Sequence, residues 1–251
     1  MPMYTVPRNT RKLGKNLFFQ PEITSTNAQA VEFAKRGEIT DGAVVITAHQ
    51  TAGKGQSGTS WSSQPNCNLT LSVYLEDPLA ATDAFYLNIV ATLAVADVCT
   101  GMGLSDVKVK WPNDVLLNGK KVSGILCENS IQGDRVRYAV IGIGLNVNQD
   151  FFDGFVATSL SLASGGNVEL DVVFHDLLVR LEHRLDQLNT GDHEVMRSEW
   201  LGRLLLYRQV HTFTTLHGPL TGAIAGIDGY GRLMVETDQG TRIFGPKEIT
   251  P

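Results

Sequence analysis

The segment at residues 107–128, VKVKWPNDVLLNGKKVSGILCE, limits the possible folds of this chain more than any other. Alternating valines predict a short strand that ends at Lys110, and Pro112 stops that strand because proline has no N–H to donate to a sheet. Asn118-Gly119 predicts a two-residue turn between two further strands. Lysines held on rigid strands can stabilise phosphate and carboxylate charge, although a surface hairpin with solvated lysines has the same spacing.

The rest of the chain shows the patterns of a mixed fold of helices and strands. We expect the first 20 residues to be a lead-in and Ser25-Thr26-Asn27 to cap the first helix. Further expected elements are strands at residues 43–47, 68–75 and 135–148 and helices at residues 28–35, 84–99, 171–188 and 194–200, the last two capped by Asp171 and Asp192. After residue 203 the sequence changes to short strands broken by glycine turns, which predicts a small β-barrel and a domain boundary there.

The composition is that of an ordinary globular protein. The 251 residues are 43% hydrophobic and 19% charged, with a net charge of −5. This balance argues against a nucleic-acid-binding protein with a broad basic face, and no uninterrupted apolar run reaches the roughly 18 residues of a membrane span. Cys67, Cys99 and Cys127 lack metal-type spacing and fit a reducing cytosol, and the histidines form no zinc motif, so we expect no structural metal.

A glycine-rich loop, Gly53-Lys54-Gly55-Gln56-Ser57-Gly58, follows the strand expected at residues 43–47. It has the spacing of a dinucleotide-binding loop, but such a loop must open directly into a helix whose N-terminus meets the pyrophosphate. The residues that follow, up to Pro65, are poor helix formers, so we reject the dinucleotide-binding interpretation. Two interpretations remain: an ordinary surface loop, or a flexible lid that closes over a small anionic ligand.

Three further motifs each have a structural and a functional interpretation. The segment from Gly142 to Asn148 ends an apolar strand, where its glycines either form a bulge or let a flat ring approach. Asn146 can read the edge of adenine, because an amide both donates and accepts. Ser25-Thr26-Asn27 either only caps a helix or also faces a polar ligand, and we expect Cys127 to pack as a small apolar residue.

In their order and spacing these motifs resemble the catalytic module of biotin protein ligases. The matching pieces are Ser25-Thr26-Asn27, the loop from Gln50 to Trp61, the run Lys110-Trp111-Pro112-Asn113-Asp114, Gly119-Lys120-Lys121 with Gly124, and the segment from Gly142 to Asn148. The resemblance implies an α+β fold, a mixed sheet packed with helices of the kind shared with class II aminoacyl-tRNA synthetases. It further implies a catalytic domain at residues 1–203 and an SH3-like domain at residues 204–251.

The resemblance also implies a reaction. The family joins biotin to ATP, which gives biotinyl-5′-AMP and pyrophosphate, and then transfers biotin to one lysine of a biotin carboxyl carrier protein. By resemblance the catalytic residues are Lys110 and Lys54. Biotin binding falls to Ser25, Thr26, Asn27, Gln50, Gly53, Gly55, Gln56, Lys110 and Gly124, and ATP binding to Lys54, Trp61, Asn113, Lys121 and Asn146. Mg²⁺ is expected to arrive with the ATP phosphates rather than at an all-protein site.

The chain departs from the familiar bacterial members in two respects. Their glycine loop is rich in arginine, whereas this loop offers one cation, so we expect Lys54 to carry most of its charge. The first motif begins at Ser25, which leaves no room before it for the DNA-binding domain of bifunctional members. We therefore expect a monofunctional cytoplasmic ligase without nucleic-acid or membrane partners, and a homodimer stays an open possibility.

Two alternatives remain open at this point. A lipoate ligase or octanoyltransferase shares the fold, but an octanoyltransferase needs a nucleophilic cysteine paired with a lysine, and nothing favours Cys127 for that role. A non-catalytic biotin-sensing module is the second alternative. Lys110, Lys121 and Asn146 argue against it, because sensing biotin alone does not require an ATP site.

Overall fold

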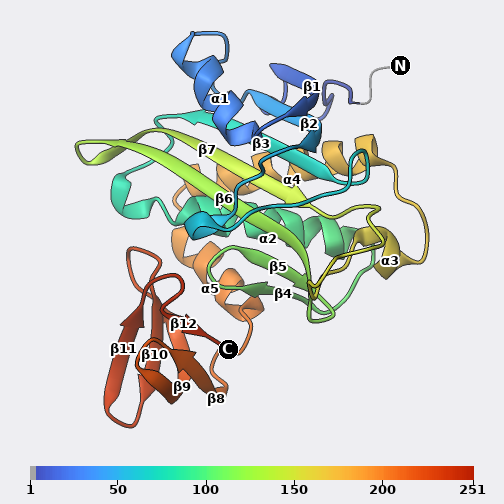
Figure 1. Ribbon diagram of the computed structural model, residues 1–251. Coiled ribbons are helices and arrows are strands. Elements are labelled where there is room, and N and C mark those ends of the chain that lie inside the picture. Colours follow the sequence, from blue (N-terminus) through green and yellow to red (C-terminus); the bar gives the residue numbers. More distant parts are fainter. Residues whose placement is uncertain (1–3) are drawn as a thin grey trace.

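The computed structural model describes residues 4–251, which form a large mixed domain and a small β domain (Figure 1). The large domain is built on a seven-stranded sheet with the order β1-β2-β3-β7-β6-β5-β4. Its strands are β1 (Leu17–Ile23), β2 (Val44–Gln50), β3 (Leu69–Glu76), β4 (Val107–Lys110), β5 (Asp114–Leu117), β6 (Lys120–Gln132) and β7 (Arg135–Leu145). β1 pairs in parallel with β2 and the remaining neighbours pair antiparallel, so the expected mixed sheet is confirmed.

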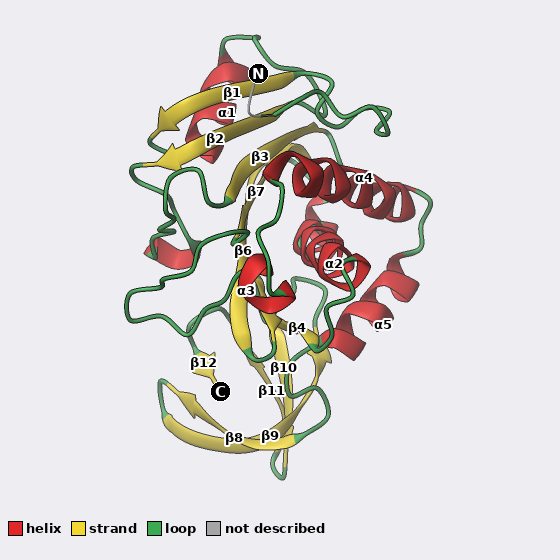
Figure 2. Cartoon of the chain, turned by 90° about the vertical axis from the view of Figure 1, so that its right-hand side faces the viewer, coloured by secondary structure: helices red, strands yellow, loops and turns green. Residues whose placement is uncertain are grey.

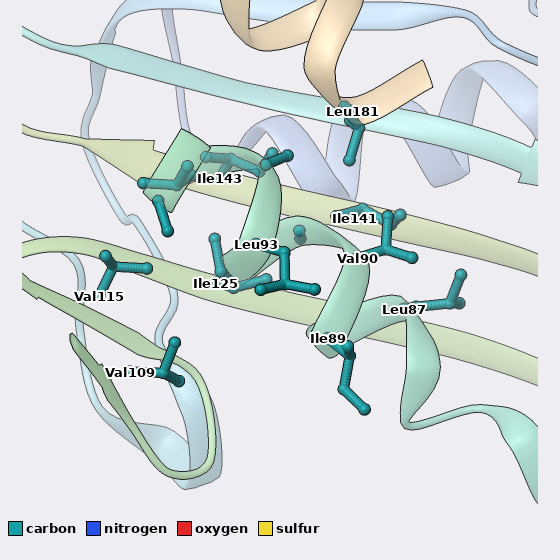
Figure 3. Close-up of a cluster of buried hydrophobic side chains, with 14 of the residues drawn as sticks. Leu87, Ile89, Val90, Leu93, Val109, Val115, Ile125, Ile141, Ile143 and Leu181 are labelled. Carbon is teal, nitrogen blue, oxygen red and sulfur yellow. The ribbon is translucent and has the colours of Figure 1, made fainter. Parts of the chain in front are cut away.

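Alternation along the strands gives this sheet two different faces. Val44 and Ile46 of β2 belong to the main core, whereas Val45 between them packs with α1 (Thr26–Lys35). The main core lies beneath α2 (Tyr86–Gly101) and α4 (Leu170–Asn189), with α5 (His193–Arg203) beside them (Figure 2). Figure 3 shows residues of this core that come from both helices and from four strands: Leu87, Ile89, Val90, Leu93, Val109, Val115, Ile125, Ile141, Ile143 and Leu181.

Helix α2 and the 3-10 turn before it form a continuous apolar segment, Ala81–Gly101. Within residues 4–251 it is the one helix long and apolar enough to cross a membrane by length and composition alone. Most of it is buried inside the protein, where it packs on the sheet and against α4. The sequence has no uninterrupted apolar run of that length, but the helix passes a test on average hydropathy, because polar residues such as Asn88 interrupt the run without lowering its average enough.

The small domain is a five-stranded antiparallel sheet with the order β11-β10-β9-β8-β12. Its strands are β8 (Val210–Thr215), β9 (Gly218–Ile227), β10 (Leu233–Thr237), β11 (Gly240–Phe244) and β12 (Ile249–Thr250). The domain is joined to the large one through the backbone: Leu205 donates to the carbonyl oxygen of Val109 at 2.8 Å. Its apolar side chains, among them Phe213 and Val235, belong to the same continuous core as α2.

Most elements expected from the sequence are present. Ser25 caps α1 by accepting from the N–H of Ala28, and Asn118 and Gly119 have φ of +51° and +74°, as a tight hairpin turn requires. One expected cap is wrong: α4 begins at Leu170, so Asp171 lies inside the helix, where its side chain accepts from Thr5. Asp192 does occupy the N-cap position of α5, but its side chain forms no capping hydrogen bond.

The lead-in and one helix also differ from expectation. Residues 17–23 form the edge strand β1, and Leu13 is buried, so the start of the chain is part of the domain. A short helix α3 (Leu160–Ser164) was not expected; Ser159 caps it by accepting from the N–H of Leu162.

Candidate active site

A cavity of about 440 Å³ opens on the α1 side of the sheet, where the two domains meet. Its walls come from the start of α1, the lid loop (residues 51–66), the β4–β5 turn, strands β6 and β7, and the small domain. The lining includes most of the site residues predicted from the sequence: Ser25, Thr26, Asn27, Gln50, Lys54, Gly55, Gln56, Trp61, Lys110, Asn113, Lys121 and Gly124. Segments far apart in the chain therefore come together as one site.

The floor of the cavity is made of glycines that leave no room for a side chain. A Cβ atom on Gly144 of β7 would lie 2.3 Å from Cε2 of Trp61, and one on Gly124 of β6 would lie 3.3 Å from the same ring. A Cβ atom on Gly142 would lie 2.4 Å from Oδ1 of Asn27. Two strands thus carry glycine where the lid indole and the α1 amide lie against the sheet, which supports the close-approach interpretation of these glycines.

One end of the cavity is polar and tightly hydrogen-bonded. The side-chain oxygen of Gln50 accepts from the backbone N–H of Thr26 at 2.7 Å. Beneath it, Ser72 lies 2.7 Å from the Thr26 hydroxyl and 2.5 Å from Oδ1 of Asn27. The amide of Asn27 donates to the carboxylate of Glu128 at 2.6 Å. This end therefore offers fixed polar groups for a small polar head group.

Three lysines of the large domain reach the cavity from different elements. Lys110 ends β4 opposite Asp114 and is half-buried, and it forms no ion pair within the described residues 4–251. Lys121 is bound to Asp114 at 2.6 Å, and its Nζ lies 5.8 Å from the centre of the Trp61 ring. Lys54 is exposed on the lid. Lys110 is thus the strand-held cation available to a ligand, while Lys121 is shared with a carboxylate.

The lid is a folded hairpin rather than the start of a helix. Trp61 donates to the carbonyl oxygen of Gly53 at 2.9 Å, and Gly55 donates to that of Thr59 at 2.7 Å. Only a 3-10 turn, Gln56–Gly58, follows the first glycines. The rejection of the dinucleotide-binding interpretation is therefore confirmed, because the loop continues into a 3-10 turn and then extended backbone instead of opening into an α-helix.

Two predicted site residues lie outside the cavity lining. Gly53 lies behind it, where a Cβ atom would lie 2.7 Å from Nε2 of Gln50. Asn146 is buried, and its amide donates to the carbonyl oxygen of Thr158 at 3.0 Å. In this arrangement the amide nitrogen of Asn146 holds the following loop, and a contact of Asn146 with adenine stays a prediction.

Other cavity residues were not anticipated from the sequence. Phe155 lines the cavity although the residue is 74% exposed. Its loop is attached to Lys121 by a hydrogen bond from the backbone N–H of Lys121 to the carbonyl oxygen of Val156. The small domain contributes Phe213, Ile224, Leu233 and Lys247. Phe155 could have been suspected, because residues 151–156 hold several large apolar side chains in a loop. No local sequence pattern indicates that residues of the small domain line the cavity.

No thiol in this region suits nucleophilic chemistry. Burial raises the pKa of the Cys127 thiol to about 12, so the thiolate form is disfavoured. Cys127 lies within β6, as expected of a packed residue. Within residues 4–251 no group of three or more His, Cys, Asp or Glu side chains is arranged to hold a metal ion.

The chain is similar to known proteins along nearly its whole length. The Biotin/lipoate A/B protein ligase family matches residues 19–146, and the Biotin protein ligase C terminal domain matches residues 212–245. The bifunctional ligase/repressor BirA of Bacillus spizizenii is 34% identical over 238 residues, which cover 93% of this chain and 73% of that protein. The biotin–[acetyl-CoA-carboxylase] ligase of Paracoccus denitrificans is 32% identical over 237 residues, covering 90% and 96%.

A solved structure agrees with these matches. The biotin protein ligase of Aquifex aeolicus in complex with biotin and ATP superposes with a TM-score of 0.78 at 26% identity, covering 94% of this chain and 98% of that one. Sequence and structure thus point to the same group of proteins. The chain belongs to the biotin/lipoate A/B protein ligase family and carries the C-terminal domain of the biotin protein ligases.

Proposed function

We propose that this protein is an ATP-dependent biotin protein ligase. It joins the carboxylate of biotin to the α-phosphate of ATP, releases pyrophosphate, and transfers biotin from biotinyl-5′-AMP to a lysine of a biotin carboxyl carrier protein. The proposal depends on one observation: the polar groups at Thr26 and Gln50 and the lysines on the other walls line the same cavity.

In the first step Lys110 is the catalytic residue. Attack of a carboxylate on a phosphate brings two negative groups together, and a cation on a rigid strand lowers that repulsion without a covalent intermediate. Lys110 is at the end of β4 and is not neutralised by a carboxylate in the described part of the chain. Its position therefore suits the reacting centre between biotin and ATP.

The nucleotide is bound by groups on the opposite walls. Lys121 and Lys54 contact phosphates, and Trp61 and Phe155 cover the base. Asn113 lines this region, but its amide donates to the carbonyl oxygen of Ile125, so it supports the β4–β5 turn. Asp114 is the nearby carboxylate that could help to hold Mg²⁺, but it is already paired with Lys121, so the ATP phosphates would supply most of the oxygen ligands.

The second step needs protection of the intermediate more than further activation. A mixed anhydride reacts readily with amines and also with water, so the site must exclude water until the carrier lysine enters. The lid hairpin and Phe155 lie over the cavity and suit this role. We place the enzyme in the cytoplasm, a compartment in which its three free thiols stay reduced.

The test is incubation with ATP, labelled biotin and a biotin carboxyl carrier domain. We expect pyrophosphate release and label on the carrier, and loss of both by at least a hundredfold in Lys110→Met, because removal of one charge-stabilising donor costs on the order of 10²–10³ in rate. Biotin bound without pyrophosphate release identifies a sensor. Carrier labelled with lipoate instead of biotin identifies the lipoate-ligase alternative, and either result contradicts the proposal.

A further inference from the structure

The buried side chain of Gln149 contacts both loops that cover the cavity. One is the lid loop, which brings Trp61 to the cavity, and the other is the Phe155 loop (residues 150–157). Gln149 is 7% exposed, and it does not belong to the cavity lining. Its hydrogen bonds therefore act on the two loops and not on a ligand.

Three hydrogen bonds connect this amide to three segments of the chain. Its oxygen, Oε1, accepts from the backbone N–H of Gln64, near the end of the lid loop, at 3.1 Å. Oε1 also accepts from the side-chain amide of Asn68, directly before β3, at 2.6 Å. The nitrogen, Nε2, donates to the carbonyl oxygen of Phe151 in the Phe155 loop at 2.8 Å. The lid loop, the sheet and the Phe155 loop thus meet at one side chain.

Backbone groups fix the orientation of the Gln149 amide. The N–H of Gln64 can only donate and the carbonyl oxygen of Phe151 can only accept, so a turned amide would oppose donor to donor and acceptor to acceptor. Asn68 is oriented in the same way, because the backbone N–H of Val147 donates to its side-chain oxygen at 2.9 Å. Asn68 is 2% exposed, so both amides depend on these protein partners. One arrangement of hydrogen bonds satisfies them all.

Each loop is also held by the sheet at a second point. The backbone N–H of Lys121 donates to the carbonyl oxygen of Val156 at 3.1 Å, which fixes the far end of the Phe155 loop to β6. The backbone N–H of Asn66 donates to the carbonyl oxygen of Ala48 at 3.0 Å, which fixes the end of the lid loop to β2. Gln149 adds to these attachments a connection between the two loops themselves.

We propose that Gln149 is a positioning residue that connects the lid loop to the Phe155 loop, so that the two loops retain biotinyl-5′-AMP together. Gln64 follows Trp61 by three residues, and Phe151 precedes Phe155 by four, so the amide sets the spacing between the two aromatic walls. Loss of the connection lets water enter and the intermediate leave before the carrier lysine arrives. The inference rests on the proposed function, which supplies that intermediate.

The first measurement needs no ligand. Hydrogen exchange reports the local opening of each loop separately. Gln149→Met keeps the length of the side chain and removes the amide. We expect exchange in both the lid loop and the Phe155 loop to become about fivefold faster, the usual effect of losing one neutral hydrogen bond.

Gln149→Glu separates the two connections. Its carboxylate still accepts from Gln64 and Asn68 but cannot donate to Phe151. Exchange should therefore rise in the Phe155 loop and stay at the wild-type rate in the lid loop. Glutamate has the size of the native side chain, so this variant decides the matter if Gln149→Met fails to fold.

The second measurement is the release of biotinyl-5′-AMP formed on the enzyme. Both Gln149 variants lose the connection between the loops, and we expect release to become about tenfold faster. Asn148→Ala is the matched control: the side chain of Asn148 forms two hydrogen bonds with the backbone of Val168, at 2.9 and 2.7 Å, outside the cavity lining. It should lower stability without changing lid exchange or adenylate release.

The outcomes separate the inference from the function on which it rests. Unchanged lid exchange in Gln149→Met, or unchanged adenylate release in the Gln149 variant that folds, overturns the positioning role. An equal rise of release in Asn148→Ala overturns it as well, because stability alone would then control release. Absence of biotin-dependent pyrophosphate release in the wild type overturns the proposed function instead, whereas the exchange measurements test the connection by themselves.

Discussion

The indole nitrogen of Trp111 donates a hydrogen bond of 2.8 Å to the carbonyl oxygen of Gly231. Trp111 follows Lys110 directly, whereas Gly231 belongs to a turn of the small domain. That turn packs tightly against the large domain at a position that only glycine fits. The φ angle of Gly231 is +78°, and a Cβ atom there would lie 2.1 Å from the ring of Phe85 at the start of α2. The small domain therefore holds the residue next to the proposed catalytic lysine.

Trp111→Phe should lower kcat for biotinyl-5′-AMP formation about fivefold, since it removes one neutral hydrogen bond of about 1 kcal/mol while keeping an aromatic ring. Single-turnover pyrophosphate release measures this rate. Thr47→Val is the control, because it removes the hydrogen bonds of a fully buried hydroxyl on β2, outside the cavity lining. It should lower stability and leave kcat unchanged; an equal loss of kcat in both variants would mean that the Trp111 bond acts only through stability.

Lys54→Ala should raise KM for ATP five- to tenfold and speed the release of biotinyl-5′-AMP, because the lid then has no cation. The effect should shrink as salt is raised from about 0.05 to 0.5 M, since Lys54 is exposed and its charge is screened. Filter binding of labelled adenylate measures the release. Lys35→Ala, at an exposed position at the end of α1, should change neither quantity. Unchanged ATP affinity and adenylate release in Lys54→Ala would contradict this role for the lid.

Gly144→Ala should weaken biotin binding at least tenfold, because its Cβ atom would lie 2.3 Å from the Trp61 ring and must push the indole off the floor. Calorimetric titration with biotin gives the affinity. Gly166→Ala is the control: no atom lies within 4 Å of its added Cβ and its φ is not positive. Retained biotin affinity in Gly144→Ala would show that the indole can move without harm to the site.

The carboxylate of Glu182 on α4 accepts hydrogen bonds from the start of the chain, and these bonds lead us to expect a pH-dependent stability. Burial raises the pKa of its carboxyl, but three backbone N–H groups, those of Arg11, Lys12 and Leu13, outweigh it and hold the pKa below its ordinary value. A lowered folded-state pKa stabilises the protein above the unfolded pKa, about 4.3, and this contribution is lost as pH falls through the folded value.

Glu182→Gln should therefore lower the free energy of unfolding by about 1.5–3 kcal/mol at pH 7, the usual size for hydrogen bonds to a charged group. The difference from wild type should vanish below the folded pKa. Urea unfolding at pH 7 and at about pH 2.5 checks both values, with Glu236→Gln on the exposed side of β10 as a control that changes neither. A difference that persists at the lower pH would contradict the assignment.

Local chemistry made part of this molecule predictable. The β5–β6 turn follows from Asn118-Gly119, the start of α1 from Ser25, and the end of β4 from Pro112, because each depends on the conformational preference of one or two residues. The lid could be recognised as a non-helical loop from the residues after Gly58 for the same reason.

The rest depended on contacts that no local pattern records. The edge strand β1 is specified by parallel pairing with β2, some 27 residues later in the chain. Its own sequence gives little sign of a strand, because Pro21 lies within it between Gln20 and Glu22. Asn146 was read as a ligand-binding amide, whereas the fold places the carbonyl oxygen of Thr158 beside it. The wall formed by Phe213 and Leu233 arises from domain packing alone.

This shared wall has a consequence for synthesis of the protein. Residues that line the cavity begin at Ser25 and continue to Pro251, so the ribosome makes the α1 wall of the site long before the wall that the small domain contributes. A nascent chain that has emerged only as far as α5 can hold the seven-stranded sheet, the lid and Lys110, yet one wall of its cavity is still absent. Biotin activation should therefore begin only after residue 251 has left the exit tunnel, which would keep unfinished chains from consuming ATP.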